Sequence, residues 1–502
     1  MKKNLFNLTL LIISFVLLSP ILIAFLYPME LEVRESTLWL HVLTMKANIN
    51  IYDGKLVAYA NQAHGVMDPI IKYLINLSFP FLQPWQVSRI FWVLSYFLIF
   101  LINYLVFKNL KKKNLLTISL ITSIIFYSLF FLFTKTFQGR ADITAFFFII
   151  LLSYLCIDRD FFYKNKAVII AFLAAIILLT NWRFLILVAC IIAYPLSMNI
   201  KKLKVFKFYF FIRLIFLTFI FLSIPLLIFW LFFDLNLNRF INYFIKFFYF
   251  DSHFNLNHYI NGLKSLWLVE KFFVLILFSI LLFFILYKKT KKIFIYKNKI
   301  KLFFFTVVVL FSVIQYLYNY VGGGVYYFTP ISIFLWFLFI DFIKNDTVYF
   351  NNKKFGFISL FLLITLIIVI SVSSVKNSVL ASIKLVKTFN EAKIAHQYFS
   401  QLSEKHLVLS ESLHFFKKKY NNEKIDIGDL LSYRAFQIGG DYQDTYKKHL
   451  SDISGLQYNY IIHVFTDSSI INDLFKKQSY KEIKSIQISG TNLGKISILK
   501  KN

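Results

Sequence analysis

Cysteines and acidic residues are scarce in this sequence of 502 residues. The two cysteines, Cys156 and Cys190, both lie inside apolar segments, so the sequence indicates neither a disulfide framework nor a thiolate metal site. Charged residues make up 16% of the chain, and only 25 acids stand against 55 lysines and arginines. This composition excludes a soluble globular protein of ordinary type.

Apolar residues fill most of what remains. The chain is 58% hydrophobic and 20% aromatic, with a mean hydropathy of +0.66. Its long apolar runs predict about eleven membrane-spanning helices, and hence an all-α polytopic membrane protein. The predicted spans lie near 5–27, 88–107, 115–134, 142–157, 167–180, 183–198, 208–233, 270–287, 302–318, 327–343 and 357–374.

Lysine clusters predict the orientation of these spans. The clusters fall on alternate loops, including 108–113, 201–207 and 288–301. Because cytoplasmic loops carry an excess of lysine and arginine, we expect these loops and the N-terminus in the cytoplasm. The same distribution explains the net charge of +30 without a nucleic-acid partner. The sequence therefore predicts a multi-pass protein of the inner (plasma) membrane, surrounded by membrane lipids.

The C-terminal part differs in composition from the rest. Residues 376–502 are mixed and charged, and short apolar runs at 406–409, 460–465 and 495–499 predict strands. We expect a multispanning domain over 1–375, with a large first outer loop at 28–87. A small extracytoplasmic α/β domain is expected over 376–502.

Acidic residues appear where the first span ends. Glu32 and Glu35 are three residues apart, so they share one face of a helix, whereas Arg34 points elsewhere. Carboxylates at a membrane boundary are costly unless they are paired or used. One of the two could act as a base that takes the proton from a hydroxyl group. The alternative is the solvated face of an interfacial helix.

Further candidates lie on the same predicted side of the membrane. Arg140 stands in a turn between two spans and could contact a phosphate, because guanidinium groups match phosphate oxygens. Asp142 could orient Arg140 or cap the following helix. Arg183 could bind a lipid phosphate or simply reach the headgroups. Gly323 and Tyr327 belong to a glycine-rich opening of the tenth span, where a close backbone approach is possible. The outer histidines show no metal-ligand spacing.

Four segments resemble motifs of a known family. They are Glu32–Ser36, His64–Ile71, Gly139–Asp142 and Gly323–Pro330, and they occur in the family's order along the first 330 residues. In these segments the chain resembles the bacterial GT-C glycosyltransferases, multispanning enzymes that use polyprenyl-phosphate-linked sugars. The group includes enzymes similar to dolichyl-phosphate-mannose transferases.

The resemblance implies an inverting glycosyltransferase without a cofactor. A polyprenyl-phosphate-linked sugar would be the donor, and a hydroxyl group of a saccharide, lipid or protein the acceptor. A transporter or flippase, or a polymerase, of lipid-linked saccharides is the alternative. The implied catalytic residues are Glu32 and Glu35. The implied substrate-binding residues in these segments are Arg34, Arg140, Asp142, Gly323 and Tyr327, and Arg183 is added as a cation near the outer interface.

Overall fold

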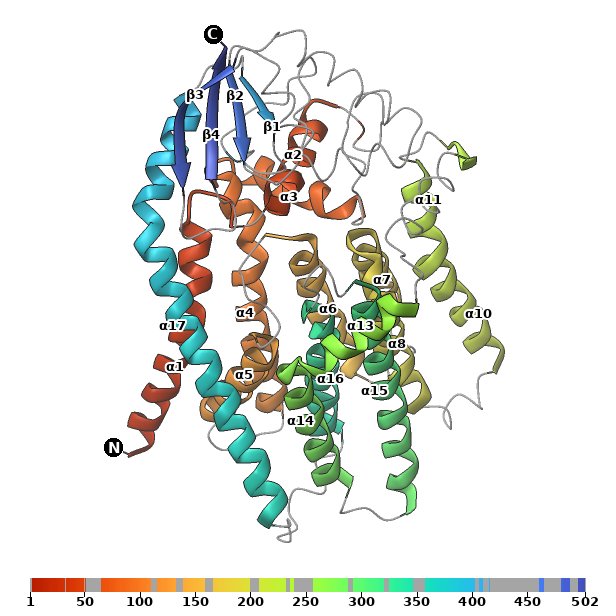
Figure 1. Ribbon diagram of the computed structural model, residues 1–502. Helices are drawn as coiled ribbons and strands as arrows, with labels where there is room; N and C mark the ends of the chain where they lie inside the picture. Colours follow the sequence, from red (N-terminus) through yellow and green to blue (C-terminus); the bar gives the residue numbers. More distant parts are fainter. Residues whose placement is uncertain are drawn as a thin grey trace.

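The structure, a computed structural model, is a tall helical bundle that carries a small sheet at one end (Figure 1). The N-terminus lies at the opposite end of the bundle from the sheet and the C-terminus. The structure describes residues 2–31, 33–48, 50, 65–109, 115–131, 139–158, 166–198, 207–231, 235–238, 256–287, 292–319, 325–345, 357–401, 406–409, 415, 460–464, 480–487 and 495–501.

Each predicted span overlaps a helical segment, which confirms the predicted helical class. Among the described residues, four helical stretches are long and apolar enough to cross a membrane: Asn4–Leu26, Pro84–Lys108, Lys299–Leu317 and Ile367–Gln401. Shorter apolar helices make up the rest of the bundle. The helices of the bundle are α1 (Lys2–Leu26), α4 (Pro84–Asn109), α5 (Leu115–Phe131), α6 (Ala141–Ile157), α7 (Lys166–Thr180), α8 (Leu185–Met198), α10 (Lys207–Thr218), η4 (Phe219–Ser223), α11 (Ile224–Leu231), α14 (Glu270–Tyr287), α15 (Lys292–Asn319), α16 (Thr329–Asn345) and α17 (Phe357–Gln401).

The bundle is apolar on its outside as well as in its core. Large side chains such as Phe15, Phe172 and Leu310 are more than half exposed on the outer helices. In water such a surface would be unfavourable and prone to association, whereas acyl chains solvate it well. Helices α6 and α7 pack against each other, and most of their side chains are buried. Their buried sides form part of the core of the bundle.

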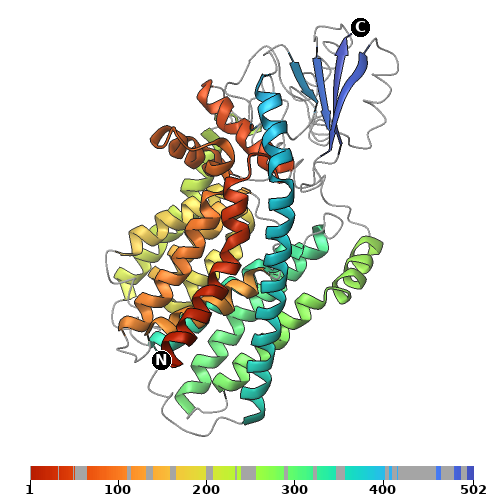
Figure 2. The ribbon, with the colours of Figure 1, turned by 90° about the vertical axis from the view of Figure 1, so that its left-hand side faces the viewer.

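Some short helices lie beside the long helices of the bundle. Helices α2 (Val33–Lys46) and α3 (Met67–Ser78) follow the first span and lie at the end that carries the sheet (Figures 1 and 2). Helix α13 (Leu256–Trp267) lies between the predicted spans at 208–233 and 270–287, and it packs beside α15. The first turn of α13 contains polar residues, and its strong amphipathic pattern distinguishes it from the apolar spans.

The sheet has four strands in the order β1-β2-β4-β3. Strands β1 (His406–Leu409) and β2 (Tyr460–Val464) are parallel, while β4 (Lys495–Lys501) is antiparallel to β2 and to β3 (Tyr480–Gln487). Three of these strands coincide with the predicted ones, and β3 was not predicted. Ile496 and Ile498 on β4 are fully buried and two residues apart, so the sheet has an apolar face of its own.

Helix α17 runs without interruption through residue 375, where the sequence predicts a domain boundary. Its last turns extend beyond the bundle and lie beside the sheet (Figure 2). There the Lys484 ammonium lies 3.9 Å from the centre of the Tyr398 ring. A single continuous helix thus connects the bundle to the sheet, and the division into two domains stays a prediction.

Candidate functional site

The candidate site lies at the sheet-bearing end of the bundle. There α2 and α3 meet the start of α4, the turn before α6 and the end of α7. These elements are far apart in sequence, and their polar side chains join in two buried ion pairs and one partly exposed network.

The first buried pair joins Glu35 on α2 to Arg89 on α4. Arg89 Nε donates to Glu35 Oε1, and Arg89 Nη2 donates to Glu35 Oε2, each at 2.7 Å. The remaining guanidinium N–H groups donate to the backbone carbonyls of Ala24, Tyr27 and Met29. All five donors of Arg89 are therefore used, and they fix the end of α1 to α4.

The carboxylate of Glu35 is equally occupied. Besides the two bonds from Arg89, its Oε2 accepts the Leu31 N–H at 2.7 Å, and its Oε1 accepts the Gly139 N–H. With four donors on two oxygens and no exposed surface, Glu35 is well suited to orienting its neighbours. This geometry favours an orienting role over that of a base.

The second buried pair joins Asp68 and Lys72, one turn apart on α3. Lys72 Nζ lies 2.8 Å from Asp68 Oδ2, and neither side chain is exposed. Asp68 Oδ1 accepts the Thr144 hydroxyl of α6 at 2.6 Å. Lys72 Nζ also donates to the Gly139 carbonyl at 2.7 Å. This pair fixes α3 against the opening of α6.

Gly139 is held at both its N–H and its C=O groups, and its position leaves no room for a side chain. A Cβ atom there would lie 2.4 Å from the Ser88 carbonyl oxygen. Gly65, before α3, is similarly close to the Leu179 carbonyl, at 1.7 Å for a built Cβ. Glycine at both positions permits a backbone approach that other residues forbid.

The partly exposed network starts at Arg140, which follows Gly139 and caps α6. Arg140 Nε lies 3.5 Å from Asp142 Oδ2, and the two side chains are 13% and 25% exposed. Asp142 Oδ1 also accepts a hydrogen bond from the Asn181 amide at the end of α7. Asn181 in turn accepts the Arg183 backbone N–H at 3.0 Å.

Arg183 and Tyr327 complete the network. The Arg183 guanidinium lies over the Tyr327 ring, 5.3 Å from its centre, in cation–π geometry. Gln315 on α15 donates to the Arg183 carbonyl at 3.1 Å. Four predicted substrate-binding residues, Arg140, Asp142, Arg183 and Tyr327, therefore belong to one contiguous network. It carries two guanidinium groups and one carboxylate.

Phe415, from the C-terminal part of the chain, contacts the first pair. Its backbone N–H donates to Glu30 Oε1 at 2.9 Å, and its ring centre is 5.7 Å from the Arg89 guanidinium carbon. The Phe415 ring also meets Trp39 of α2 edge-on. The C-terminal part of the chain thus packs directly against the acidic segment after the first span.

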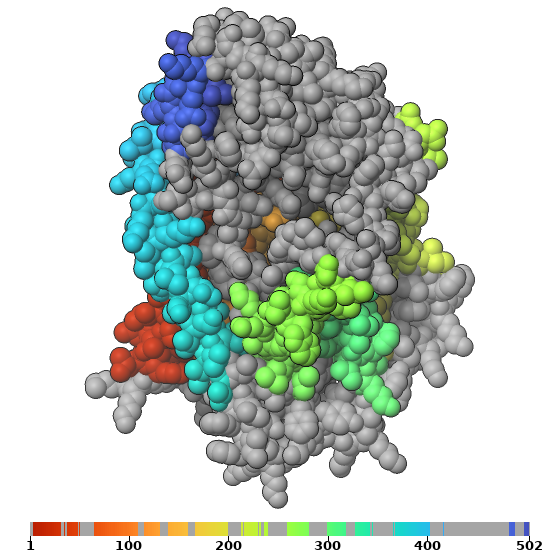
Figure 3. Space-filling model, viewed as in Figure 1, coloured from red at the N-terminus to blue at the C-terminus, as the bar shows by residue number. Residues whose placement is uncertain are grey.

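A hollow lies between this end of the bundle and α13. In Figure 3 the surface is hollowed above α13, and orange and gold atoms, in the colours of residues from α4 to α8, are visible inside it. Helix α13 adjoins the site, because its Ser265 hydroxyl is 2.7 Å from that of Tyr316, whose ring stacks on Phe328 next to Tyr327.

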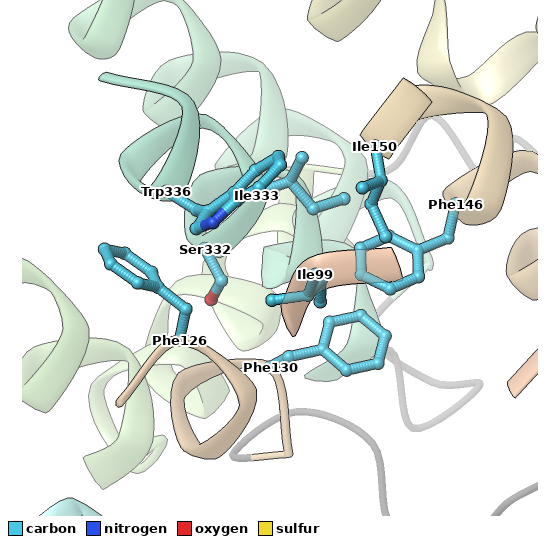
Figure 4. Close-up of a pocket in the computed structure, with 8 residues that line it drawn as sticks. All are labelled: Ile99, Phe126, Phe130, Phe146, Ile150, Ser332, Ile333 and Trp336. Atoms are coloured by element: carbon cyan, nitrogen blue, oxygen red, sulfur yellow. The ribbon is translucent and has the colours of Figure 1, made fainter. Parts of the chain in front are cut away.

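A separate cavity inside the bundle is too small for a sugar. Side chains such as Phe130, Ile150 and Trp336 line it, together with the single hydroxyl of Ser332 (Figure 4). Its volume of about 20 Å³ is enough for one water molecule.

The described residues do not cover every predicted site residue. Glu32 and Gly323 lie outside them, and of Arg34 only the helical backbone is described. Sequence reasoning missed Arg89 and Lys72 as parts of the site. A lone arginine inside an apolar span and an aspartate–lysine pair at i, i+4 were the available signals. Within the described part of the chain, no group of three or more metal-ligating side chains gathers.

Comparison with known proteins gives one distant likeness. No protein-family model matches the chain, and no curated protein matches it in sequence. Among solved structures, the chain is similar to ArnT from Cupriavidus metallidurans bound to undecaprenyl phosphate. The TM-score is 0.49 at 10% identity, and the match covers 99% of this chain and 97% of ArnT. At this distance the likeness carries no functional conclusion, so the function has to follow from the residues of the site.

Proposed function

We propose that the chain is a GT-C-type membrane glycosyltransferase that moves a sugar from a polyprenyl-phosphate donor to an acceptor hydroxyl on the outer face of the membrane. The observation that carries this proposal is the partly exposed network of Arg140, Asp142, Arg183 and Tyr327 at one end of an apolar bundle. Two guanidinium groups suit a phosphate, and the surrounding apolar surface suits a lipid chain.

The reaction needs little else from the protein. The acceptor oxygen forms a bond to the anomeric carbon, the bond from that carbon to the phosphate oxygen breaks, and the configuration inverts. Arg140 and Arg183 neutralise the negative charge that develops on the departing phosphate, which stabilises the transition state. Tyr327 supports Arg183 through its ring, and Asn181 holds Asp142 in place.

The base that accepts the hydroxyl proton is assigned to Glu32, one of the two glutamates that the sequence offers for this role. Glu35, its partner in that prediction, orients the site through Arg89 and Gly139 instead. Asp142 is the described carboxylate of the network with exposed surface, and it is the residue to compare with Glu32. A carboxylate within reach of the acceptor hydroxyl is sufficient for this step.

Transfer of radiolabelled sugars from a panel of polyprenyl-phosphate donors tests the proposal. Purified protein in lipid nanodiscs would be incubated with membrane extract as the source of acceptors. We expect transfer of one sugar, lost in Glu32→Gln with donor binding retained. Loss in Asp142→Asn with full activity of Glu32→Gln would move the base to Asp142. Movement of saccharide-lipid across a bilayer, with no transfer from any donor, would instead indicate a transporter.

A further inference from the structure

The buried pair of Asp68 and Lys72 is the strongest feature that the proposed reaction leaves without a role. Both side chains are fully buried on α3, where an ion pair in itself contributes little to stability. Lys72 cannot reach a substrate, since its ammonium group is enclosed and bonded to Asp68 and to the Gly139 carbonyl. Its second bond is the informative one.

The geometry points to Lys72 as a positioning residue that aims the Arg140 guanidinium at the donor phosphate. Gly139 is gripped from two sides, because Glu35 accepts its N–H and Lys72 donates to its C=O. Arg140 follows directly, so its backbone direction is set at the preceding peptide. This inference rests on the proposed function.

Asp68 holds Lys72 in place in this arrangement. It holds the Lys72 ammonium at 2.8 Å and accepts the Thr144 hydroxyl at 2.6 Å, one turn into α6. The same pair therefore contacts α6 at two points, Gly139 before the helix and Thr144 within it. Rotation or sliding of the first turn of α6 would break at least one of these bonds. Precise placement of a charged group increases binding affinity and reaction rate by a large factor.

The test is a double-mutant cycle on binding of undecaprenyl phosphate to purified protein in nanodiscs. Asp68→Asn/Lys72→Met removes the donor to Gly139 without leaving an isolated buried charge, and Asn keeps an acceptor for Thr144. Arg140→Ala removes the guanidinium group whose position Lys72 is inferred to fix. The third protein combines all three substitutions.

We expect Asp68→Asn/Lys72→Met to bind the lipid phosphate about 10-fold more weakly, and Arg140→Ala at least as weakly. In the Arg140→Ala background, Asp68→Asn/Lys72→Met is expected to add less than twofold, because Lys72 acts through Arg140. Additive losses would overturn the inference. Asp158→Asn/Lys166→Met is the control, since it removes an ion pair in a different part of the bundle, and it should leave binding unchanged.

Hydrogen exchange gives a readout that does not depend on binding. In Asp68→Asn/Lys72→Met, the amides of 139–142 should exchange faster, while those in the middle of α6 keep wild-type protection. Unchanged exchange at 139–142 would overturn the inference, as would a general loss of protection, which indicates a merely structural pair. If Arg140→Ala binds undecaprenyl phosphate like the wild type, the assignment of Arg140 in the proposed function fails instead.

Discussion

Glu35 and Arg89 face each other through two parallel hydrogen bonds of 2.7 Å, with neither side chain more than 1% exposed. The pair closes a loop of structure between α2 and α4 and leaves no donor of Arg89 unused. It makes Glu35, one of the two glutamates that the sequence offers as a catalytic base, part of the buried framework between α2 and α4.

Removing one member of this pair should destabilise the protein strongly. Arg89→Met leaves the Glu35 carboxylate buried without its cation, which costs about 3–5 kcal/mol of the free energy of unfolding. Thermal unfolding of the purified protein in detergent would show the loss as a lower Tm. A Tm equal to that of the wild type would contradict the role given to this pair.

Gly139→Ala should disturb the site at its tightest point. The new Cβ atom would lie 2.4 Å from the Ser88 carbonyl oxygen, so the turn or α4 has to move. Overpacking of this kind costs about 1–3 kcal/mol. We expect a lower Tm together with weaker binding of undecaprenyl phosphate, because Arg140 moves with the turn. Wild-type values of both quantities would show that the turn is not constrained as described.

The support of Arg183 by Tyr327 can be tested with a matched pair of substitutions. Tyr327→Phe keeps an aromatic ring under the guanidinium, whereas Tyr327→Leu removes it. We expect Tyr327→Leu to weaken undecaprenyl phosphate binding about two- to fivefold, from a cation–π contribution of about 0.5–1 kcal/mol. Tyr327→Phe should stay close to the wild type. Equal loss in both variants would assign the effect to the hydroxyl group.

Stability should fall at mildly acidic pH because of His41 on α2. Burial, with a smaller effect from the positive charge of Lys72, lowers the pKa of His41 to about 3. Folded His41 therefore stays neutral as the pH falls below about 6.5, where the unfolded chain takes up a proton. The free energy of unfolding decreases over this window, by about 2 kcal/mol at pH 5.

His41→Gln removes this contribution, so the Tm of the variant should change less between pH 7 and pH 5 than that of the wild type. Both proteins share all other titrating groups, which makes the difference in slope the informative quantity. Identical slopes would show that His41 becomes protonated in the folded protein.

Much of the fold follows from the pattern of the sequence, because apolar runs determine which segments become helices of the bundle. The turn at Arg140 and Asp142 was also predictable, as charged residues between two spans. The partners of these groups were not. Arg89 finds Glu35 at a separation of 54 residues, and Lys72 finds Gly139 at 67. Such pairings depend on how the helices pack against one another. The local pattern of apolar and polar residues does not contain that information.

The continuous helix α17 illustrates the same limit. Its charged composition after residue 375 suggested a separate domain, yet buried small residues such as Ala392 and Ala395 continue the packing face. The helix continues past residue 375 because its buried face still packs against neighbouring residues, although its exposed face is charged.

The most direct test of the account is release of free polyprenyl phosphate from a radiolabelled donor by the purified protein, compared with Arg140→Ala. We predict that the wild type releases the lipid phosphate in step with sugar transfer. Arg140→Ala should lose at least about 10-fold in rate, since a charge-assisted contact to the leaving group is removed. Equal release by wild type and variant would contradict the account, because the leaving phosphate would then not depend on this network.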